Sequence, residues 1–191
     1  MKVIAKHATK WFRAYRMALA TEGKKPSKWP TNSWIAKTLI TEHSPIRVKE
    51  YDITIDGCRT WVFGHLVRHW LGFIPFIHSQ REDRRSLDVP RDELPQGSLN
   101  DGDFAANAQA LMAISRQRLC GKASPETREV WSAVKEAIRE IDPVMADKMV
   151  PKCVYQQRCP EIKCCGFINS PKYKELLERY EKKDYGEDRP S

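Results

Sequence analysis

Hydrophobic residues recur at helical spacing in several segments of this chain, and polar stretches separate them. In residues 8–20 the apolar positions include Trp11, Tyr15 and Leu19, a spacing typical of an amphipathic helix. Ser124-Pro125 is a strong start signal for another helix, with serine at the cap and proline at the first helical position. We expect helices over residues 8–20, 34–41, 103–119, 126–141, 143–150 and 171–183.

A different pattern, with a period of two, follows the second predicted helix. Tyr51, Ile53 and Ile55 alternate with polar residues, Asp56-Gly57 is a turn signal, and residues 60–68 are rich in strand-forming types. The pattern predicts a β-hairpin over residues 48–68. Residues 22–34 and 82–103 are expected to be loops. Together these elements predict an α+β fold, with a central antiparallel sheet and flanking helices.

The length of 191 residues predicts a single domain, long enough to bury a substantial core. We expect it to be organised as an N-terminal helical region, a core, a cysteine-rich loop, and a C-terminal helix with a tail. The expected bounds are residues 1–40 for the helical region, 41–150 for the core, 151–170 for the loop and 171–191 for the end of the chain.

The chain is basic, with a net charge of +8 and a pI of about 9.2. Such a charge favours anionic partners, although it also serves solubility. The longest apolar run, Leu71 to Ile77, contains Gly72 and Pro75 and falls short of the ~18–20 residues that span a bilayer. The basic N-terminus lacks the apolar core of a secretory signal. We therefore expect no membrane association and a cytoplasmic location, where thiols stay reduced.

Six cysteines are present, and four of them lie between positions 153 and 165. Their spacing is not the C-x2-C of zinc ribbons. Three loop thiols together with one at a helix end still predict a metal site that suits zinc or an iron–sulfur cluster. The predicted ligands are Cys120, Cys153, Cys159 and Cys165. The alternatives are reduced structural thiols or a disulfide.

Two short stretches gather groups that bind anions. Arg68-His69 is placed at the end of the predicted second strand, and Ser79-Gln80-Arg81 follows a short apolar bridge. Guanidinium groups bind phosphate in a bidentate manner, and Ser and Gln add oriented hydrogen bonds. The stretches predict a pocket for an anionic, planar ligand. In the alternative interpretation, the charges of residues 81–85 simply pair with each other.

The predicted helix over 103–119 carries Asn107 and Arg118 eleven residues apart, which places both on one face, about three turns from each other. The rest of this helix is apolar or small nearly all round, so it is expected to be buried in the core or in a subunit interface. Arg118 then either pairs with a carboxylate such as Glu129 or Glu136, or points into a ligand cavity.

These stretches resemble the flavin-dependent thymidylate synthases, also called thymidylate synthase complementing proteins or the ThyX family. The chain is most similar to the short, cysteine-containing members carried by phages and some bacteria. The family signature of Arg-His-Arg, a spacer and Ser-x-Arg corresponds to Arg68-His69-Trp70 and Ser79-Gln80-Arg81. The family's Arg-x-x-Leu-Pro corresponds to Arg91–Pro95, its Asn-Ala helix to Asn107–Arg118, and an upstream Ser-Pro to Ser44-Pro45. The resemblance covers residues 40–141.

The resemblance implies an enzyme that transfers a one-carbon unit from methylenetetrahydrofolate to C5 of dUMP, with FAD supplying the hydride and NADPH reducing the flavin. It implies a homotetramer whose sites are shared between subunits, and it makes residues 41–150 the flavin- and nucleotide-binding core. Arg118, as the catalytic residue, contacts the pyrimidine base. The nucleotide-binding residues are Arg68, Ser79, Gln80, Arg81, Arg91 and Arg118, and the cofactor-binding residues are Ser44, Arg68, His69, His78 and Asn107.

The chain also departs from the family pattern. Trp70 stands in place of the second Arg of the signature, and Phe73, Pro75 and Phe76 occupy the spacer where the family has Ser, Asn and Glu. The departures predict a pyrimidine nucleotide pocket with altered cofactor handling. One alternative is a relative that makes another C5-modified nucleotide from dUMP or dCMP. The other is a non-catalytic, basic nucleic-acid-binding protein with a cysteine-bound metal, although no known nucleic-acid-binding signature is found.

Overall fold

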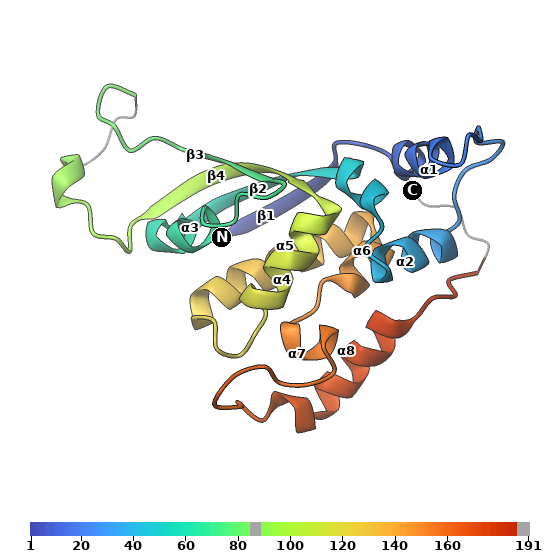
Figure 1. The fold of residues 1–191 in the computed structure, drawn as a ribbon. Coiled ribbons are helices and arrows are strands. Elements are labelled where there is room, and N and C mark those ends of the chain that lie inside the picture. Colours follow the sequence, from blue (N-terminus) through green and yellow to red (C-terminus); the bar gives the residue numbers. More distant parts are fainter. Residues whose placement is uncertain (85–88, 187–191) are drawn as a thin grey trace.

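The computed structural model describes residues 1–84 and 89–186, and these residues form a four-stranded antiparallel sheet in the order β1-β2-β4-β3 (Figure 1). Neighbouring strands pair antiparallel throughout. The predicted α+β class with a central antiparallel sheet is therefore confirmed. The strands are β1 (Lys2–His7), β2 (Glu50–Arg59), β3 (Phe73–Ile77) and β4 (Leu99–Asn107).

Most helices lie on one side of the sheet, and the C-terminal helix lies farthest from it (Figure 1). The predicted helices over 8–20, 34–41, 126–141, 143–150 and 171–183 are confirmed apart from their ends. The helices are α1 (Trp11–Ala20), α2 (Asn32–Ile40), α3 (Thr60–Leu66), α4 (Ala108–Arg118), α5 (Pro125–Ile141), α6 (Pro143–Lys148), α7 (Lys152–Tyr155) and α8 (Pro171–Glu181). Short 3₁₀ turns cover Ser44–Val48, Arg91–Glu93 and Phe167–Asn169.

The hairpin predicted over residues 48–68 is wrong, because β2 continues through Asp56-Gly57. The β2–β4 register shifts between Ile55 and Cys58, and Gly57 has a φ of +71°. A glycine in this conformation accommodates a β-bulge as well as a turn. The chain then enters α3 at Thr60, so Arg68 and His69 follow a helix rather than ending a strand. Packing of the aromatic and branched residues of α3 overrides their local strand preference.

Among the described residues, the loop predicted over 82–103 is confirmed up to residue 98, apart from the 3₁₀ turn Arg91–Glu93. Its end and the helix start predicted at 103 are wrong, because Leu99–Asn107 forms β4 and α4 begins at Ala108. The buried positions of β4 are mostly small or polar, as in Asn100, Gly102 and Ala106, so its alternation carries little hydrophobic signal. Two further strands, Lys2–His7 and Phe73–Ile77, were not predicted, and the cysteine-rich loop expected over 151–170 contains the short helix α7 and the 3₁₀ turn Phe167–Asn169.

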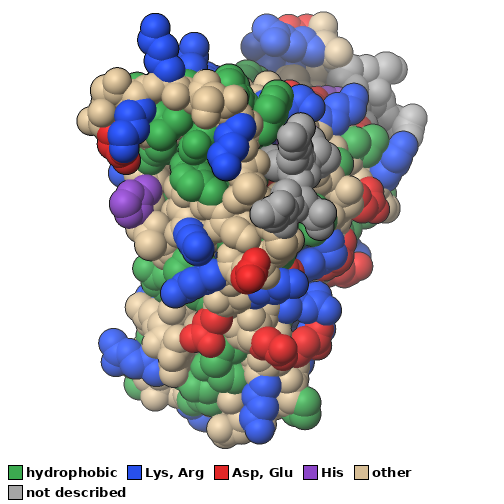
Figure 2. All heavy atoms as spheres, turned by 90° about the vertical axis from the view of Figure 1, so that its right-hand side faces the viewer, with side chains coloured by type: hydrophobic (Ala, Val, Ile, Leu, Met, Phe, Trp, Pro, Cys, Tyr) green, Lys and Arg blue, Asp and Glu red, His purple; other side chains and the backbone are tan. Residues whose placement is uncertain are grey.

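The main hydrophobic core lies between the sheet and α5, and it includes Phe73, Phe104, Trp131, Val134 and Ile138. A smaller cluster, Val150, Cys153, Val154, Tyr173 and Tyr180, packs α7 against α8. Within residues 1–84 and 89–186, no helix combines the length and apolar character needed to cross a membrane. On the face shown in Figure 2, Lys and Arg side chains are interspersed with Asp and Glu rather than forming one continuous basic surface.

Candidate functional site

Arg118, at the end of α4, contacts the segment that follows α3. Its Nε donates a hydrogen bond to His69 Nε2 at 3.0 Å, and its Nη2 donates to the carbonyl oxygen of His65 at 2.7 Å. Among the described residues, no carboxylate forms an ion pair with this guanidinium. The alternative in which Arg118 pairs with Glu129 or Glu136 is therefore wrong. Both acceptors are uncharged, so the positive charge of Arg118 is not neutralised.

His69 is an uncharged hydrogen-bonding group in this cluster. Burial, together with the neighbouring charge of Arg118, lowers the pKa of His69 to about 4, so the imidazole is neutral at pH 7. Because Nε2 accepts from Arg118, the ring proton is assigned to Nδ1, which is a donor. Burial and the nearby positive charge of Arg68 lower the pKa of Arg118. Two guanidinium groups and one neutral donor therefore lie close together, an arrangement that favours an anion.

A cavity of about 260 Å³ opens beside this cluster, between the segment after α3 and α4. Trp70 stands 80% exposed at its wall and presents a planar surface. Arg116 pairs with Glu42 and lies 3.5 Å from the centroid of the Tyr155 ring, which fixes the opposite wall. The cavity is lined by Glu42, Arg68, His69, Trp70, Leu71, Gln109, Ala110, Ala113, Ile114 and Arg116. Of these, only Arg68 and His69 were predicted as site residues, and Arg118 adjoins the cavity through His69 without lining it. No pattern in the sequence singles out the polar residues Glu42, Gln109 and Arg116.

Asn107 connects the segment after α3 to the start of α4 through hydrogen bonds to both. Its Oδ1 accepts from the backbone N–H of Ala110 at 2.9 Å and caps α4, and its backbone N–H donates to the carbonyl of Gly72 at 2.9 Å. Gly72 has a φ of +72°, and a Cβ there would stand 2.3 Å from Asn107 Nδ2. Only glycine allows this close approach. Asn107 therefore precedes the helix instead of sharing a helical face with Arg118.

The remaining predicted nucleotide-binding residues lie beyond the other end of β3, on the long excursion between β3 and β4 (Figure 1). Gln80 Nε2 donates to Thr60 Oγ1 at 3.2 Å, and Ser79 Oγ accepts from the backbone N–H of Arg81 at 3.2 Å. The backbone N–H of Arg91 donates to Glu82 Oε1 at 3.2 Å. Since a five-residue strand spans about 16 Å, a single chain does not bring these residues to Arg118.

The charges in this excursion partly pair with each other. Arg81 forms a two-point ion pair with Asp83, with N–O distances of 3.0 and 2.8 Å. His78 lies between two carboxylates, with Nδ1 at 3.7 Å from Asp101 and Nε2 at 3.8 Å from Asp103. The pairing expected over residues 81–85 is thus present for Arg81. Residue 85 lies outside the described residues.

Ser44, a predicted cofactor contact, lines a different cavity. It begins the 3₁₀ turn after α2, and the cavity of about 340 Å³ also has Trp34, Lys37 and His43 in its wall. Glu42 and His43 are neighbours in the chain, yet they line different cavities. Ser44 is therefore not among the residues that surround Arg118 and His69.

Five of the cysteines gather around α7 and the end of α4, whereas Cys58 is buried in β2, and all six are free thiols. Burial and the nearby thiols of Cys120 and Cys159 raise the pKa of Cys153 to about 11. The thiols of Cys159 and Cys164 share a hydrogen bond, and Cys165 Sγ lies 3.3 Å from the position of a Cβ on Gly121. Within the described part of the chain, no three His, Cys, Asp or Glu side chains are arranged to hold a metal ion. The metal site stays a prediction.

No protein-family model and no curated protein sequence matches this chain. Solved structures do match it. Thymidylate synthase X (ThyX) from Helicobacter pylori, solved with FAD and dUMP, has a TM-score of 0.62 at 16% identity, over 78% of this chain and 99% of that one. The UMP/dUMP methylase PolB from Streptomyces cacaoi, bound with 5-Br dUMP, has a TM-score of 0.61 at 13% identity, over 77% of this chain and 94% of that one. The chain therefore has a ThyX-like fold, shared with a second nucleotide methylase.

Proposed function

We propose that this chain is a flavin-dependent thymidylate synthase-like enzyme that binds a pyrimidine deoxynucleotide and transfers a one-carbon unit to C5 of dUMP. The observation that carries the proposal is the bonding of Arg118. Its Nε and Nη2 are held by uncharged acceptors, so its charge remains available beside the cavity that Arg68 and His69 line. The ThyX-like fold supports the same assignment.

In this proposal Arg118 is the catalytic residue. Nη1 has no partner among the described residues and is free to donate to a carbonyl oxygen of the uracil ring. A fixed guanidinium there stabilises the negative charge that develops on the ring as C5 becomes nucleophilic. The Nη2 bond to the carbonyl of His65 and the Nε bond to His69 keep the group in place and reduce the reorganisation that the reaction needs.

The proposed cofactors are FAD, NADPH and methylenetetrahydrofolate. Arg68 and the Nδ1–H of His69 fit the anionic part of a dinucleotide, and the exposed ring of Trp70 offers a flat apolar surface. When bound, the flavin would supply the hydride. A volume of 260 Å³ is below the ~300–1,000 Å³ of drug-sized sites, so FAD needs a wall from another copy of the chain.

Self-association would bring the two groups of predicted residues together. Trp70, Leu71, Ile74 and Phe76 are 80%, 72%, 55% and 60% exposed, and the last two lie on the edge strand β3. An exposed apolar stretch on an edge strand is typical of an interface. We therefore propose a homotetramer in which Ser79, Gln80, Arg81 and Arg91 of one copy approach the Arg118 of another.

The test is a measurement of bound ligands and products. Purified protein is denatured, and the released small molecules are identified by mass. The protein is then incubated with methylenetetrahydrofolate, FAD, NADPH and either dUMP or dCMP. The proposal expects released flavin and conversion of dUMP to dTMP, with loss of product in Arg118→Gln and retention in Arg16→Gln, an exposed arginine on α1. It fails if neither flavin nor nucleotide binds and no C5-modified product forms.

A further inference from the structure

A second cavity rich in positive charge lies between α5 and α8, away from the cluster around Arg118. Its volume is about 200 Å³, and its uncharged lining residues are Leu119, Ser132, Pro151, Phe167 and Leu176. None of Arg68, His69 and Arg118 lines it. The charged residues in its wall are five cations and one carboxylate, Arg128, Lys135, Arg139, Lys172, Arg179 and Glu136.

Lys135 is the unusual member of this set. It lies in the middle of α5 and is only 6% exposed, yet among the described residues nothing forms a hydrogen bond or ion pair with its ammonium group. The two other buried lysines have acceptors. Lys49 donates to His7 Nδ1 at 2.9 Å and to the carbonyl of Thr9 at 2.7 Å, and Lys148 donates to three backbone carbonyls. The Lys135 side chain is largely buried, and because its Nζ is not among the fully enclosed polar atoms without a partner, the ammonium opens to the cavity that it lines. A largely desolvated cation that faces a cavity without a protein acceptor favours an anion there.

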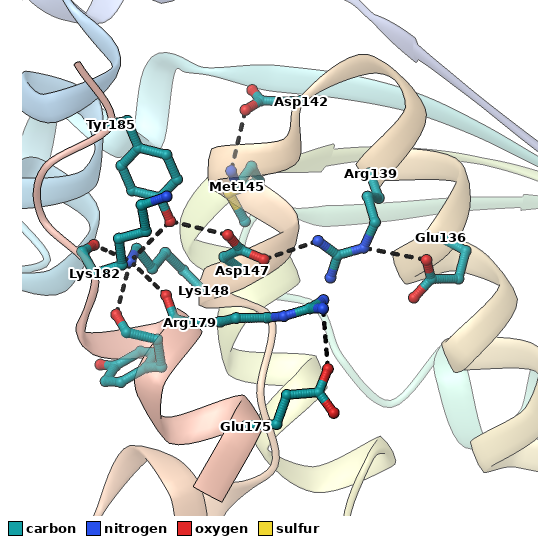
Figure 3. A network of polar contacts seen from close by, with 11 residues as sticks. Glu136, Arg139, Asp142, Met145, Asp147, Lys148, Glu175, Arg179, Lys182 and Tyr185 are labelled. Carbon is teal, nitrogen blue, oxygen red and sulfur yellow. Dashed lines mark hydrogen bonds and ion pairs between the residues drawn. The ribbon is translucent and has the colours of Figure 1, made fainter. Parts of the chain in front are cut away.

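Two guanidinium groups stand close to Lys135 and are held in place by carboxylates. Arg139 pairs with Glu136 at 3.1 Å and with Asp147 at 2.8 Å, and Arg179 pairs with Glu175 at 2.9 Å. Figure 3 shows these guanidinium groups next to one another between α5 and α8, where both line the cavity. The carboxylates orient the arginines and lie near enough to interact with the charge of Lys135, but within residues 1–84 and 89–186 none of them forms a hydrogen bond or an ion pair with it.

We propose that the cavity between α5 and α8 binds a phosphate group, with Lys135 as its central ligand and Arg139 and Arg179 on either side. A tetrahedral oxyanion accepts hydrogen bonds from an ammonium and from guanidinium edges at the same time. The volume of 200 Å³ is below that of sites for drug-sized ligands, so the cavity takes the phosphate group and not a whole nucleotide. The phosphate is either inorganic or the end of a small ester whose remainder lies outside.

The experiment follows the thermal unfolding midpoint of the full chain as inorganic phosphate is added at constant ionic strength. Ligand binding to the folded state raises the midpoint in a saturable manner. The wild-type protein is expected to show this rise. In Lys135→Met, which shortens the unbranched side chain by one atom and removes the charge, the apparent affinity is expected to fall by about tenfold or more. Lys174→Met, an exposed lysine on α8, is expected to respond as the wild type does.

Two further variants separate phosphate binding in this cavity from phosphate binding elsewhere on the chain. Arg91→Gln removes a cation of the proposed nucleotide site and should leave the phosphate response unchanged. Arg179→Gln, which changes a partly exposed side chain, should weaken the response even if Lys135→Met fails to fold. A parallel titration with dUMP reports whether the Lys135-dependent response also accepts a phosphate ester. The proposal is overturned if the wild type shows no saturable response, or if Lys135→Met and Arg179→Gln retain it in full.

Discussion

The cations near the 260 Å³ cavity and those between α5 and α8 differ in the charge of the groups that accept their hydrogen bonds. Arg118 donates to an imidazole nitrogen and a carbonyl, so it stays charged next to His69, which lines the cavity. Arg139, in contrast, donates to two carboxylates and mainly ties α5 to α6. The comparison teaches that the partners of a cation, more than its burial, decide whether it brings uncompensated charge to a cavity: Arg118 and Lys135 do, whereas the carboxylate-paired Arg139 supplies an oriented donor.

The same contrast exists between two lysines in one region. Lys148 is 1% exposed, and its Nζ donates to the carbonyls of Arg179, Tyr180 and Lys182 at 3.2, 2.7 and 2.6 Å (Figure 3). It therefore satisfies the last carbonyls of α8, which a helix leaves without intrahelical partners. Lys135 is almost as buried and, within the described residues, has no such acceptors. Replacing each lysine by methionine should therefore change stability in opposite directions.

Lys148→Met is expected to have the largest effect. It leaves three buried carbonyls without their donor, and it should lower the free energy of unfolding by about 3 kcal/mol or more. Urea unfolding monitored by circular dichroism measures this loss, with Lys174→Met as the exposed control. A loss below about 1 kcal/mol would show that Lys148 does not hold α8 in place.

Lys135→Met should stabilise the protein in phosphate-free buffer at pH 7. The substitution removes the desolvation cost of an unpaired ammonium and lets the side chain contact apolar neighbours such as Leu119 and Leu176. We expect a gain of about 1–2 kcal/mol, measured by the same urea unfolding. A loss of stability of that size would mean that Lys135 has a structural partner after all.

The advantage of Lys135→Met should depend on pH. Burial and nearby positive charges lower the pKa of Lys135 from 10.5 to about 8 in the folded state. The folded protein then carries the full cost of the charge below pH 8, and the cost disappears as the pH rises toward the unfolded pKa of 10.5. Wild-type stability should rise relative to Lys135→Met between these values. If the free energies of unfolding of the wild type and Lys135→Met changed with pH in parallel across this window, the lowered pKa of Lys135 would be contradicted.

His69→Gln is expected to give the smallest effect on stability. The pKa of His69 is about 4 in the folded state, below its ordinary value of 6.5, so the unfolded chain binds the proton more readily. Stability conferred by neutral His69 is complete above pH 6.5 and declines as the pH falls toward 4. As the pH is lowered from 6.5 to 4, the unfolding midpoint of His69→Gln should fall less than that of the wild type, as measured by thermal unfolding at a series of pH values. An identical acid decline would show that His69 titrates normally.

The helices could be predicted from the sequence because their signals are local. Ser124 accepts from the backbone N–H of Thr127, as its position before Pro125 indicates, and the apolar face of α5 contains Trp131 and Val134. The strands were harder to predict. β4 buries Asn100, Gly102 and Ala106, and β2 contains a bulge at Gly57 that has the sequence of a turn. Their positions depend on pairing with distant strands, which a local pattern does not encode.

Part of the candidate site could be found in the same way. The order of motifs in the sequence indicated that Arg68-His69, Asn107 and Arg118 belong to one site. In the structure they lie near one another, because the contact of Gly72 with Asn107 holds the segment after α3 against the start of α4. The sequence did not indicate that β3 separates Arg68 from Arg81. It also gave no reason to single out Lys135, since the residues around it come from segments distant in the sequence, among them Pro151, Phe167 and the α8 residue Arg179.

The most direct test of the proposed function is the affinity of the purified chain for dUMP, measured by isothermal titration calorimetry in the wild type, Arg118→Gln and Arg16→Gln. We predict saturable binding by the wild type and by Arg16→Gln. Binding should be about a hundredfold weaker in Arg118→Gln, because a charged donor to the ligand is lost. Absence of dUMP binding by the wild type, or equal binding by Arg118→Gln, would contradict the proposal.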